Sequence, residues 1–207
     1  MNGVSYFKME TDKSVLQLIE HFREVVALDD RQAESIAARV TIRKPGRKEY
    51  LLQPGQVSRH MRYIAKGSMR VYYLDEKSQE HTLQLGIENW WINDLYSYLS
   101  GKPSRMFIQA CEPCTIIQIC KDDLEALYKE VPVLSDFFRL KIQSAYVSLQ
   151  ERTIENMSLD TYLRYSAFVS GYRDMEQRFP QYMIASYLGI TPEFLSFLRK
   201  KHSRDVS

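Results

Sequence analysis

Residues 181–201 constrain the fold more than any other stretch of the chain, because they hold two short helical patterns with a tight turn between them. Ala185 and Leu188 fall on one face of the first pattern. Gly189 follows, and a glycine readily takes the left-handed conformation that ends many helices. Pro192 fits the first position of the second helix, where its missing N–H costs nothing. The sequence therefore predicts two helices joined by a turn.

Two features of this stretch are typical of a DNA-binding helix-turn-helix. Ala185 is small where the second helix must cross closely, and Leu195 fits the space between the helices. The outer face of the second helix would then enter the major groove. The alternative is a plain helical hairpin with a solvated charged face. The expected DNA-binding residues lie at the helix starts and along the second helix: Gln181, Thr191, Pro192, Glu193, Ser196, Phe197, Arg199 and Lys200.

The composition is that of an ordinary folded protein. Of the 207 residues, 44% are hydrophobic and 26% are charged, a balance that argues against disorder. The formal net charge is only +2, so any affinity for DNA must come from a local basic patch. No apolar run is long enough to span a membrane, and charged residues from Lys8 onward interrupt any signal-peptide pattern. We therefore expect a cytoplasmic protein.

The cysteines and histidines predict neither a metal centre nor a catalytic site. Cys111 and Cys114 form a nominal Cys-x-x-Cys pair, but a zinc site would need a second pair of ligands. His60 and His81 stand alone, whereas a cupin-like metalloenzyme needs a His-x-His pair. No nucleophile–base constellation is visible. We expect no enzyme activity, no metal and no cofactor, and a cupin-like metalloenzyme is the less favoured alternative.

Upstream of the helical hairpin, the pattern changes from helices to short strands. Helices are expected over residues 13–27 and in a short segment after Asp29. From about Thr41, glycine and proline separate six strand-like runs, which are 49–52, 60–65, 69–74, 81–85, 105–110 and 115–120. Many short strands at regular spacing favour an antiparallel β-roll or jelly-roll barrel. A short helix over residues 121–128 follows, so the fold class is α+β.

A long helix is predicted from residue 132 to residue 157. It carries one apolar stripe with the spacing of a coiled-coil seam and a second stripe on another face. We expect the first stripe to form a homodimer interface through Phe138, Ile142, Ala145 and Leu149. The alternative is that both stripes pack within one subunit. The expected domains are a sensor domain with N-terminal helices (1–131), the dimerisation helix (132–157) and the helix-turn-helix domain (158–207).

The order of β-barrel, long helix and helix-turn-helix resembles the Crp/Fnr superfamily of bacterial transcription regulators. The resemblance covers about residues 28–201, and the segments 52–55, 63–71 and 181–199 carry it. It implies a cyclic-nucleotide-binding-like sensor barrel and a homodimer that binds palindromic promoter DNA. An unknown small-molecule effector and RNA polymerase are further partners that it suggests. A regulator-like fold that acts through protein contacts, without specific DNA binding, is the main alternative.

The residues that match the family's nucleotide pocket depart from its pattern. Members that bind cyclic AMP use a Gly-Glu pair and an arginine for the cyclic phosphate, whereas this chain has Asn93, Asp94 and Ser104. Arg105 is offset by one residue, which turns a side chain to the other face of a strand. The resemblance therefore implies a pocket that does not take cyclic AMP. Its expected lining is Asn93, Asp94, Leu95, Ser104, Arg105 and Met106.

The second helix of the hairpin also departs from the family. Crp/Fnr regulators usually have Ser-Arg where this chain has Ser196 and Phe197. Phe197 borders an apolar arc that also contains Phe194, Leu195 and Leu198. It either packs inward or touches a thymine methyl group.

Overall fold

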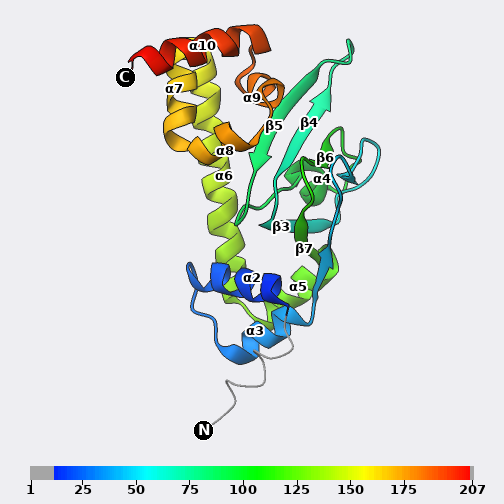
Figure 1. Ribbon diagram of the computed structural model, residues 1–207. Coiled ribbons are helices and arrows are strands. Elements are labelled where there is room, and N and C mark those ends of the chain that lie inside the picture. The colour runs from blue at the N-terminus through cyan, green and yellow to red at the C-terminus, as the bar shows by residue number, and fades with distance from the viewer. Residues whose placement is uncertain (1–11, 206–207) are drawn as a thin grey trace.

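Two antiparallel sheets form a β-roll at the centre of the molecule, in a computed structural model that describes residues 12–205 (Figure 1). Lys8, the first of the charged residues that interrupt a signal-peptide pattern, lies outside the described residues. One sheet has the order β1-β7-β3 and the other the order β2-β6-β4-β5. Their bounds are β1 (Val40–Arg43), β2 (Tyr50–Leu52), β3 (His60–Lys66), β4 (Met69–Leu74), β5 (Glu80–Gly86), β6 (Phe107–Ala110) and β7 (Thr115–Cys120).

The α+β fold class and the six expected strands are confirmed, with shifts of one or two residues at their ends. The structure adds β1, which pairs with β7 from Val40 opposite Ile119 to Arg43 opposite Ile116. The sequence missed β1 because the strand is four residues long and follows a helix directly.

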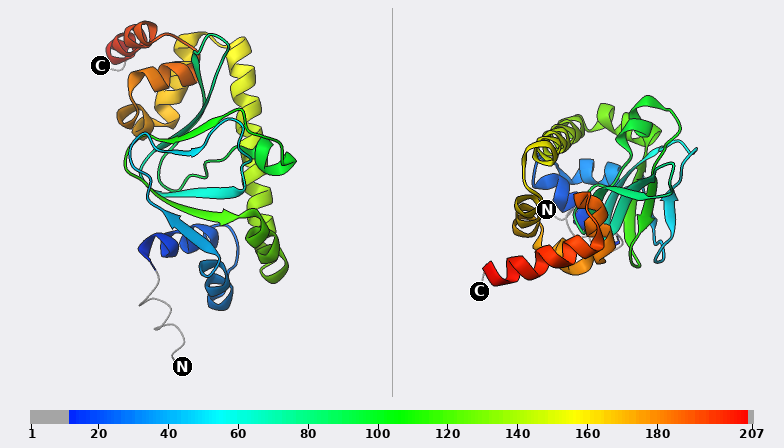
Figure 2. Two further views of the ribbon diagram at one scale, coloured as in Figure 1. Left: turned by 90° about the vertical axis from the view of Figure 1, so that its right-hand side faces the viewer. Right: turned by 90° about the horizontal axis from the view of Figure 1, so that it is seen from above.

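Helices cover the sheets on one side, as the view from above shows (Figure 2). Their bounds are α2 (Lys13–Arg23), α3 (Asp30–Ala37), α4 (Leu95–Ser100), α5 (Lys121–Glu130), α6 (Val133–Ser158), α7 (Thr161–Gly171), α8 (Arg173–Arg178), α9 (Gln181–Leu188) and α10 (Pro192–Asp205). The sequence predicts α2, α3, α5, α6, α9 and α10 as separate helices. The structure also has α4 and α8, which are only six residues long, and α7, which begins the C-terminal helices. No helix within residues 12–205 is long and apolar enough to cross a membrane.

The core of the sensor domain lies where α2, α5 and the start of α6 pack on the three-stranded sheet. Phe22 and Phe137 meet there edge to face, with ring centroids 4.6 Å apart. Phe138 lies in the same core and is only 2% exposed. One of the four residues expected in the dimer seam is therefore held inside the subunit.

Beyond Phe138, α6 leaves this core and runs up to the C-terminal helices (Figure 1). Ile142 is half-buried, whereas Ala145 and Leu149 are exposed. Further large apolar side chains are exposed on the same helix: Leu140, Tyr146, Val147, Ile154 and Met157. The division of the chain after residues 131 and 157 stays a prediction.

Candidate nucleic-acid interface

Helices α9 and α10 form the tight two-helix arrangement that the sequence predicts. Gly189 ends α9 in the left-handed conformation, with φ 69°. The next N–H, that of Ile190, donates to the carbonyl of Ala185 at 3.0 Å. At the start of α10, the hydroxyl of Thr191 accepts the N–H of Phe194 at 3.2 Å. Each local device therefore has the geometry for which its residue type is suited.

Small and large apolar side chains pack between the two helices. Ala185 and Leu195 are both fully buried, and Leu198 is 1% exposed. They belong to one hydrophobic cluster with side chains from α7, α8 and β5. This packing fixes which face of α10 points to solvent.

The outer face of α10 carries both polar and aromatic side chains. Glu193 and Lys200 are exposed, and Ser196 is half-buried. Phe194 and Phe197 are 42% and 58% exposed, so they do not share the buried arc of Leu195 and Leu198. Of the two alternatives for Phe197, packing inward is therefore wrong.

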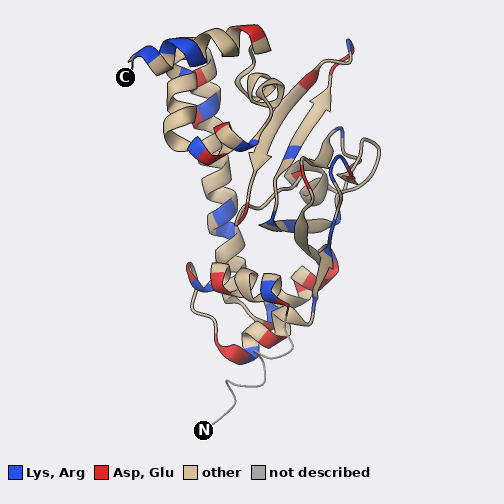
Figure 3. Cartoon of the chain, viewed as in Figure 1, with Lys and Arg blue, Asp and Glu red and all other residues tan. Residues whose placement is uncertain are grey.

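The basic residues of α10 differ in whether another side chain of the protein already binds them. The Arg199 Nε atom lies 3.2 Å from Glu176 Oε1 on α8, and the Lys201 ammonium lies over the ring of Tyr162. Lys200 has no acidic partner among residues 12–205. Basic residues gather along the later part of α10, while Glu193 stands at its start (Figure 3). Lys200 is thus better placed than Arg199 to meet a phosphate.

The remaining expected DNA contacts lie at the helix starts. Gln181, Thr191 and Pro192 are all exposed. Gln181 is the first residue of α9, and Pro180 before it provides no side-chain cap. The N–H groups of Gln181 and Tyr182 are therefore open to an acceptor such as a phosphate oxygen, whereas that of Met183 donates to the carbonyl of Pro180 at 3.0 Å.

Helix α9 also packs against the edge strand of the sensor domain, which the sequence did not predict. The Ser186 hydroxyl donates to the carbonyl of Glu80 at 2.8 Å and accepts the N–H of Thr82 at 2.9 Å. Cys111 lies beside it, with its sulfur 3.8 Å from that of Met183. Ser186 therefore continues the hydrogen bonding of β5 into the helix-turn-helix.

An ion-pair network closes the same contact from α8. Arg178 pairs with both oxygens of Glu88 and, at 2.6 Å, with Glu112. Hydrogen bonds from Arg178 lower the pKa of Glu88 to about 2. The network joins α8 to two loops of the sensor domain.

The expected effector pocket is occupied by its own side chains. Asp94 is 3% exposed, caps α4 by accepting the N–H of Ser97, and accepts the hydroxyl of Ser104 at 2.6 Å. Asn93 accepts the backbone N–H of Arg62. Arg105 is exposed and Leu95 and Met106 are half-buried. The structure therefore brings Asp94 and Ser104 together and leaves Arg105 outside.

A buried cation that the sequence analysis overlooked lies nearby on β3. Arg62 is 3% exposed, and its hydrogen bonds to Ser58, His60 and Leu51 are 3.2–3.4 Å long. Its Nε atom has no hydrogen-bond partner within residues 12–205. Burial lowers the pKa of Arg62 to about 10. The signal in the sequence was a charge between two buried apolar residues of one strand.

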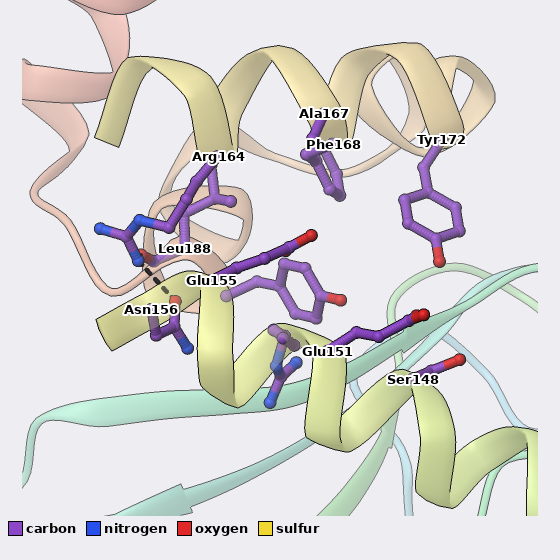
Figure 4. Close-up of a pocket in the computed structure, with 11 residues that line it drawn as sticks. Ser148, Glu151, Glu155, Asn156, Arg164, Ala167, Phe168, Tyr172 and Leu188 are labelled. Atoms are coloured by element: carbon purple, nitrogen blue, oxygen red, sulfur yellow. Dashed lines mark hydrogen bonds between the residues drawn. The ribbon is translucent and has the colours of Figure 1, made fainter. Parts of the chain in front are cut away.

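A small cavity lies where α6, α7 and α9 meet. Its volume is about 160 Å³, and Glu151, Glu155 and Tyr172 line it (Figure 4). At one end, Arg164 of α7 donates to Asn156 of α6 and to the carbonyl of Leu188 at the end of α9. This arginine therefore ties the long helix to the helix-turn-helix.

The Cys-x-x-Cys pair gives no sign of metal or redox chemistry. Cys111 and Cys114 are free thiols, and burial raises the pKa of Cys111 to about 12. Among residues 12–205, no group of three or more potential metal ligands comes together.

Known proteins resemble this chain in sequence over the barrel and in fold over most of its length. Residues 43–131 match the cyclic nucleotide-binding domain family. CLP from Xanthomonas campestris, described as a c-di-GMP responsive global regulator, superposes with a TM-score of 0.67 at 14% identity, over 86% of this chain and 93% of that chain. None of the curated proteins gives a match to the sequence.

Two further solved structures share the fold. A variant of CooA from Carboxydothermus hydrogenoformans has a TM-score of 0.67 at 20% identity, over 94% of this chain and 86% of that chain. A protein from Eubacterium rectale that is assigned to the Crp/Fnr family of transcriptional regulators has a TM-score of 0.64 at 14% identity, over 86% and 85%. The predicted resemblance to Crp/Fnr regulators is confirmed at the level of the fold.

Proposed function

We propose that this protein is a DNA-binding transcription regulator of the Crp/Fnr type that binds promoter DNA as a homodimer. The observation that carries the proposal is the pair α9–α10, in which Leu195 and Leu198 are buried while Glu193 and Lys200 stay exposed on the opposite face. A helix held in this way presents side chains to the major groove. The fold that the chain shares with Crp/Fnr regulators supports the same conclusion.

The contacts divide by chemistry. Glu193 and Ser196 meet base edges, and Glu193 accepts from a cytosine amino group. Lys200 holds a phosphate, and Gln181 and Thr191 add phosphate contacts at their helix starts. Arg199 joins them only if it leaves Glu176.

The barrel does not bind cyclic AMP. The carboxylate of Asp94 is already engaged by Ser97 and Ser104, and Arg105 faces solvent. Neither Asp94 nor Arg105 is therefore available for the ribose and cyclic-phosphate contacts that the family pattern implies. RNA polymerase is the further partner proposed for a promoter-bound regulator.

The dimer forms through the exposed part of α6. Large apolar side chains along one helix that residues 12–205 leave exposed are typical of a subunit interface. Of the expected seam, Ile142, Ala145 and Leu149 remain available, whereas Phe138 is held in the core.

Selection from a random oligonucleotide pool tests the function. We expect enrichment of a palindrome whose half-sites lie about 34 Å, one helical turn, apart. Lys200→Ala weakens binding to all sequences and lowers the salt slope by about one. Glu193→Ala instead relaxes the preference at one position of each half-site, at a cost of roughly 1–3 kcal/mol for the favoured base.

The two variants serve as controls for each other, because one removes a phosphate contact and the other a base contact. If no palindrome is enriched and the two variants behave alike, specific DNA binding is wrong, and a role through protein contacts takes its place.

A further inference from the structure

Two phenylalanines stand at the middle of the outer face of α10. Phe197 follows Glu193 by four residues and precedes Lys200 by three, so all three share one side of the helix. Phe194 lies next to Phe197, with ring centroids 6.0 Å apart and ring planes inclined by only 15°. Together the two rings form one apolar surface, which we call the aromatic pair.

The aromatic pair contributes nothing to the core of its own domain. Tyr165, Phe168 and Phe179 are each at most 4% exposed and belong to the hydrophobic cluster of the helix-turn-helix domain. Phe194 and Phe197 do not belong to this cluster. Two exposed rings side by side leave apolar area in water, which a binding partner would cover.

We propose that the aromatic pair binds the C5-methyl groups of thymines in the major groove. This inference rests on the proposed DNA-binding function of α10. A phenyl ring can neither donate to nor accept from a base edge in the manner of Arg or Asn. The thymine methyl group is the apolar feature that the major groove offers to such a ring.

The charges around the aromatic pair favour DNA as the occupant. Lys200 projects from the same face without an acidic partner in the part of the chain that the structure describes. A cation beside an apolar surface matches a methyl group beside a phosphate backbone. Glu193 adds a preference for a C·G pair, so a thymine lies close to a cytosine in each half-site.

Replacing thymine by uracil, with deoxyuridine in the DNA, tests the proposal. The two bases differ in the major groove only by the C5-methyl group. The DNA is the sequence enriched from the random pool, with each conserved thymine replaced in turn. We expect the unaltered protein to lose about 3- to 5-fold in affinity at a thymine that the pair covers, which is the effect of burying one methyl group. Phe197→Ala should bind both DNAs about equally.

Two further variants sharpen the test. Phe197→Leu keeps an apolar side chain and should keep part of the discrimination. Tyr182→Ala removes a ring that is 47% exposed on α9, away from the aromatic pair, and should keep all of it. Because Phe197 is exposed, its variants should melt at the same temperature as the unaltered protein.

The outcomes separate this inference from the proposed function. Specific DNA binding with no conserved thymine, with equal affinity for thymine and uracil, or with discrimination that survives Phe197→Ala would overturn the methyl contact and leave the regulator in place. Failure to enrich any sequence would overturn the regulator itself. Binding of a protein to the aromatic pair in place of DNA would overturn both.

Discussion

Asp94 and Ser104 illustrate how two side chains change a pocket. The carboxylate of Asp94 is buried and accepts hydrogen bonds from the N–H of Ser97 and the hydroxyl of Ser104. Ser104 also accepts the N–H of Met106, so it links α4 to the start of β6. A buried acceptor that is satisfied from within has little to offer a ligand hydroxyl. The pair therefore stabilises the barrel where the family pattern places nucleotide contacts.

Ser104→Ala should lower the free energy of unfolding by about 1.5–3 kcal/mol, because it leaves a buried carboxylate oxygen without its donor. Urea denaturation measures the change. Ser100→Ala is the matched control, because the Ser100 hydroxyl is exposed: it donates to the carbonyl of Tyr96 and accepts the N–H of Lys102, and water can replace it in both bonds. The control should change stability by less than about 0.5 kcal/mol. Equal effects of the two variants would contradict the structural role of Ser104.

At the scale of elements, local sequence patterns predict most helices and strands, because turn and capping residues determine the conformation of the residues next to them. Gly189 and Pro192 shape the chain next to them, so the helix-turn-helix can be found from the sequence. Ser186 could not be recognised, because the backbone that it bonds, at Thr82, is 104 residues away. The burial of Phe138 and the exposure of Phe197 depend in the same way on which elements pack there.

Arg178 adds ion pairs to the contact that Ser186 and Leu85 make between β5 and the C-terminal helices. Arg178 holds Glu88 and Glu112 together, and Glu88 also accepts the N–H of Gly67. Because the pKa of Glu88 in the folded state is lowered from 4.5 to about 2, its contribution to stability is complete above pH 4.5. That contribution is lost as the pH falls from 4.5 towards 2, when the carboxylate takes up a proton.

Arg178→Met should release α9 from β5 at neutral pH. Hydrogen exchange at the N–H of Thr82, which donates to Ser186, should become faster, because the ion pairs no longer support the contact. Arg173→Met, at the start of the same helix, should leave this exchange unchanged. In the unaltered protein the same exchange, relative to its intrinsic rate, should become faster as the pH falls from 4.5 towards 2, because Glu88 then takes up a proton. Equal exchange in the two variants would show that Arg178 does not hold the contact.

At the scale of the whole molecule, α6 contacts both the barrel and the C-terminal helices. Its start packs in the sensor core through Phe137, and Arg152 further along donates to the carbonyl of Leu83 on β5. Asn156 near its end accepts from Arg164 of α7. Any force on α6 therefore reaches the sensor barrel and the helix-turn-helix together. A second copy bound along α6 would fix the distance between the two recognition helices.

The last prediction concerns which side of α6 that second copy covers. Ile142, Ala145 and Leu149 follow one another at spacings of three and four, and Tyr146 lies four residues after Ile142 and three before Leu149. Together they make the double row that knobs-into-holes packing needs. Val147 and Ile154 lie seven residues apart, with the polar Glu151 between them, and make only a single row.

The double variant Ile142→Glu with Leu149→Glu should therefore be a monomer by light scattering, since it places four charges in the paired seam. Val147→Glu with Ile154→Glu is the matched control: it adds the same charge at side chains that are 50% and 62% exposed, and it should stay a dimer. If the control separates and the first variant does not, the interface lies on the single row. If neither separates, α6 is not the interface, and the half-site spacing expected from it loses its basis.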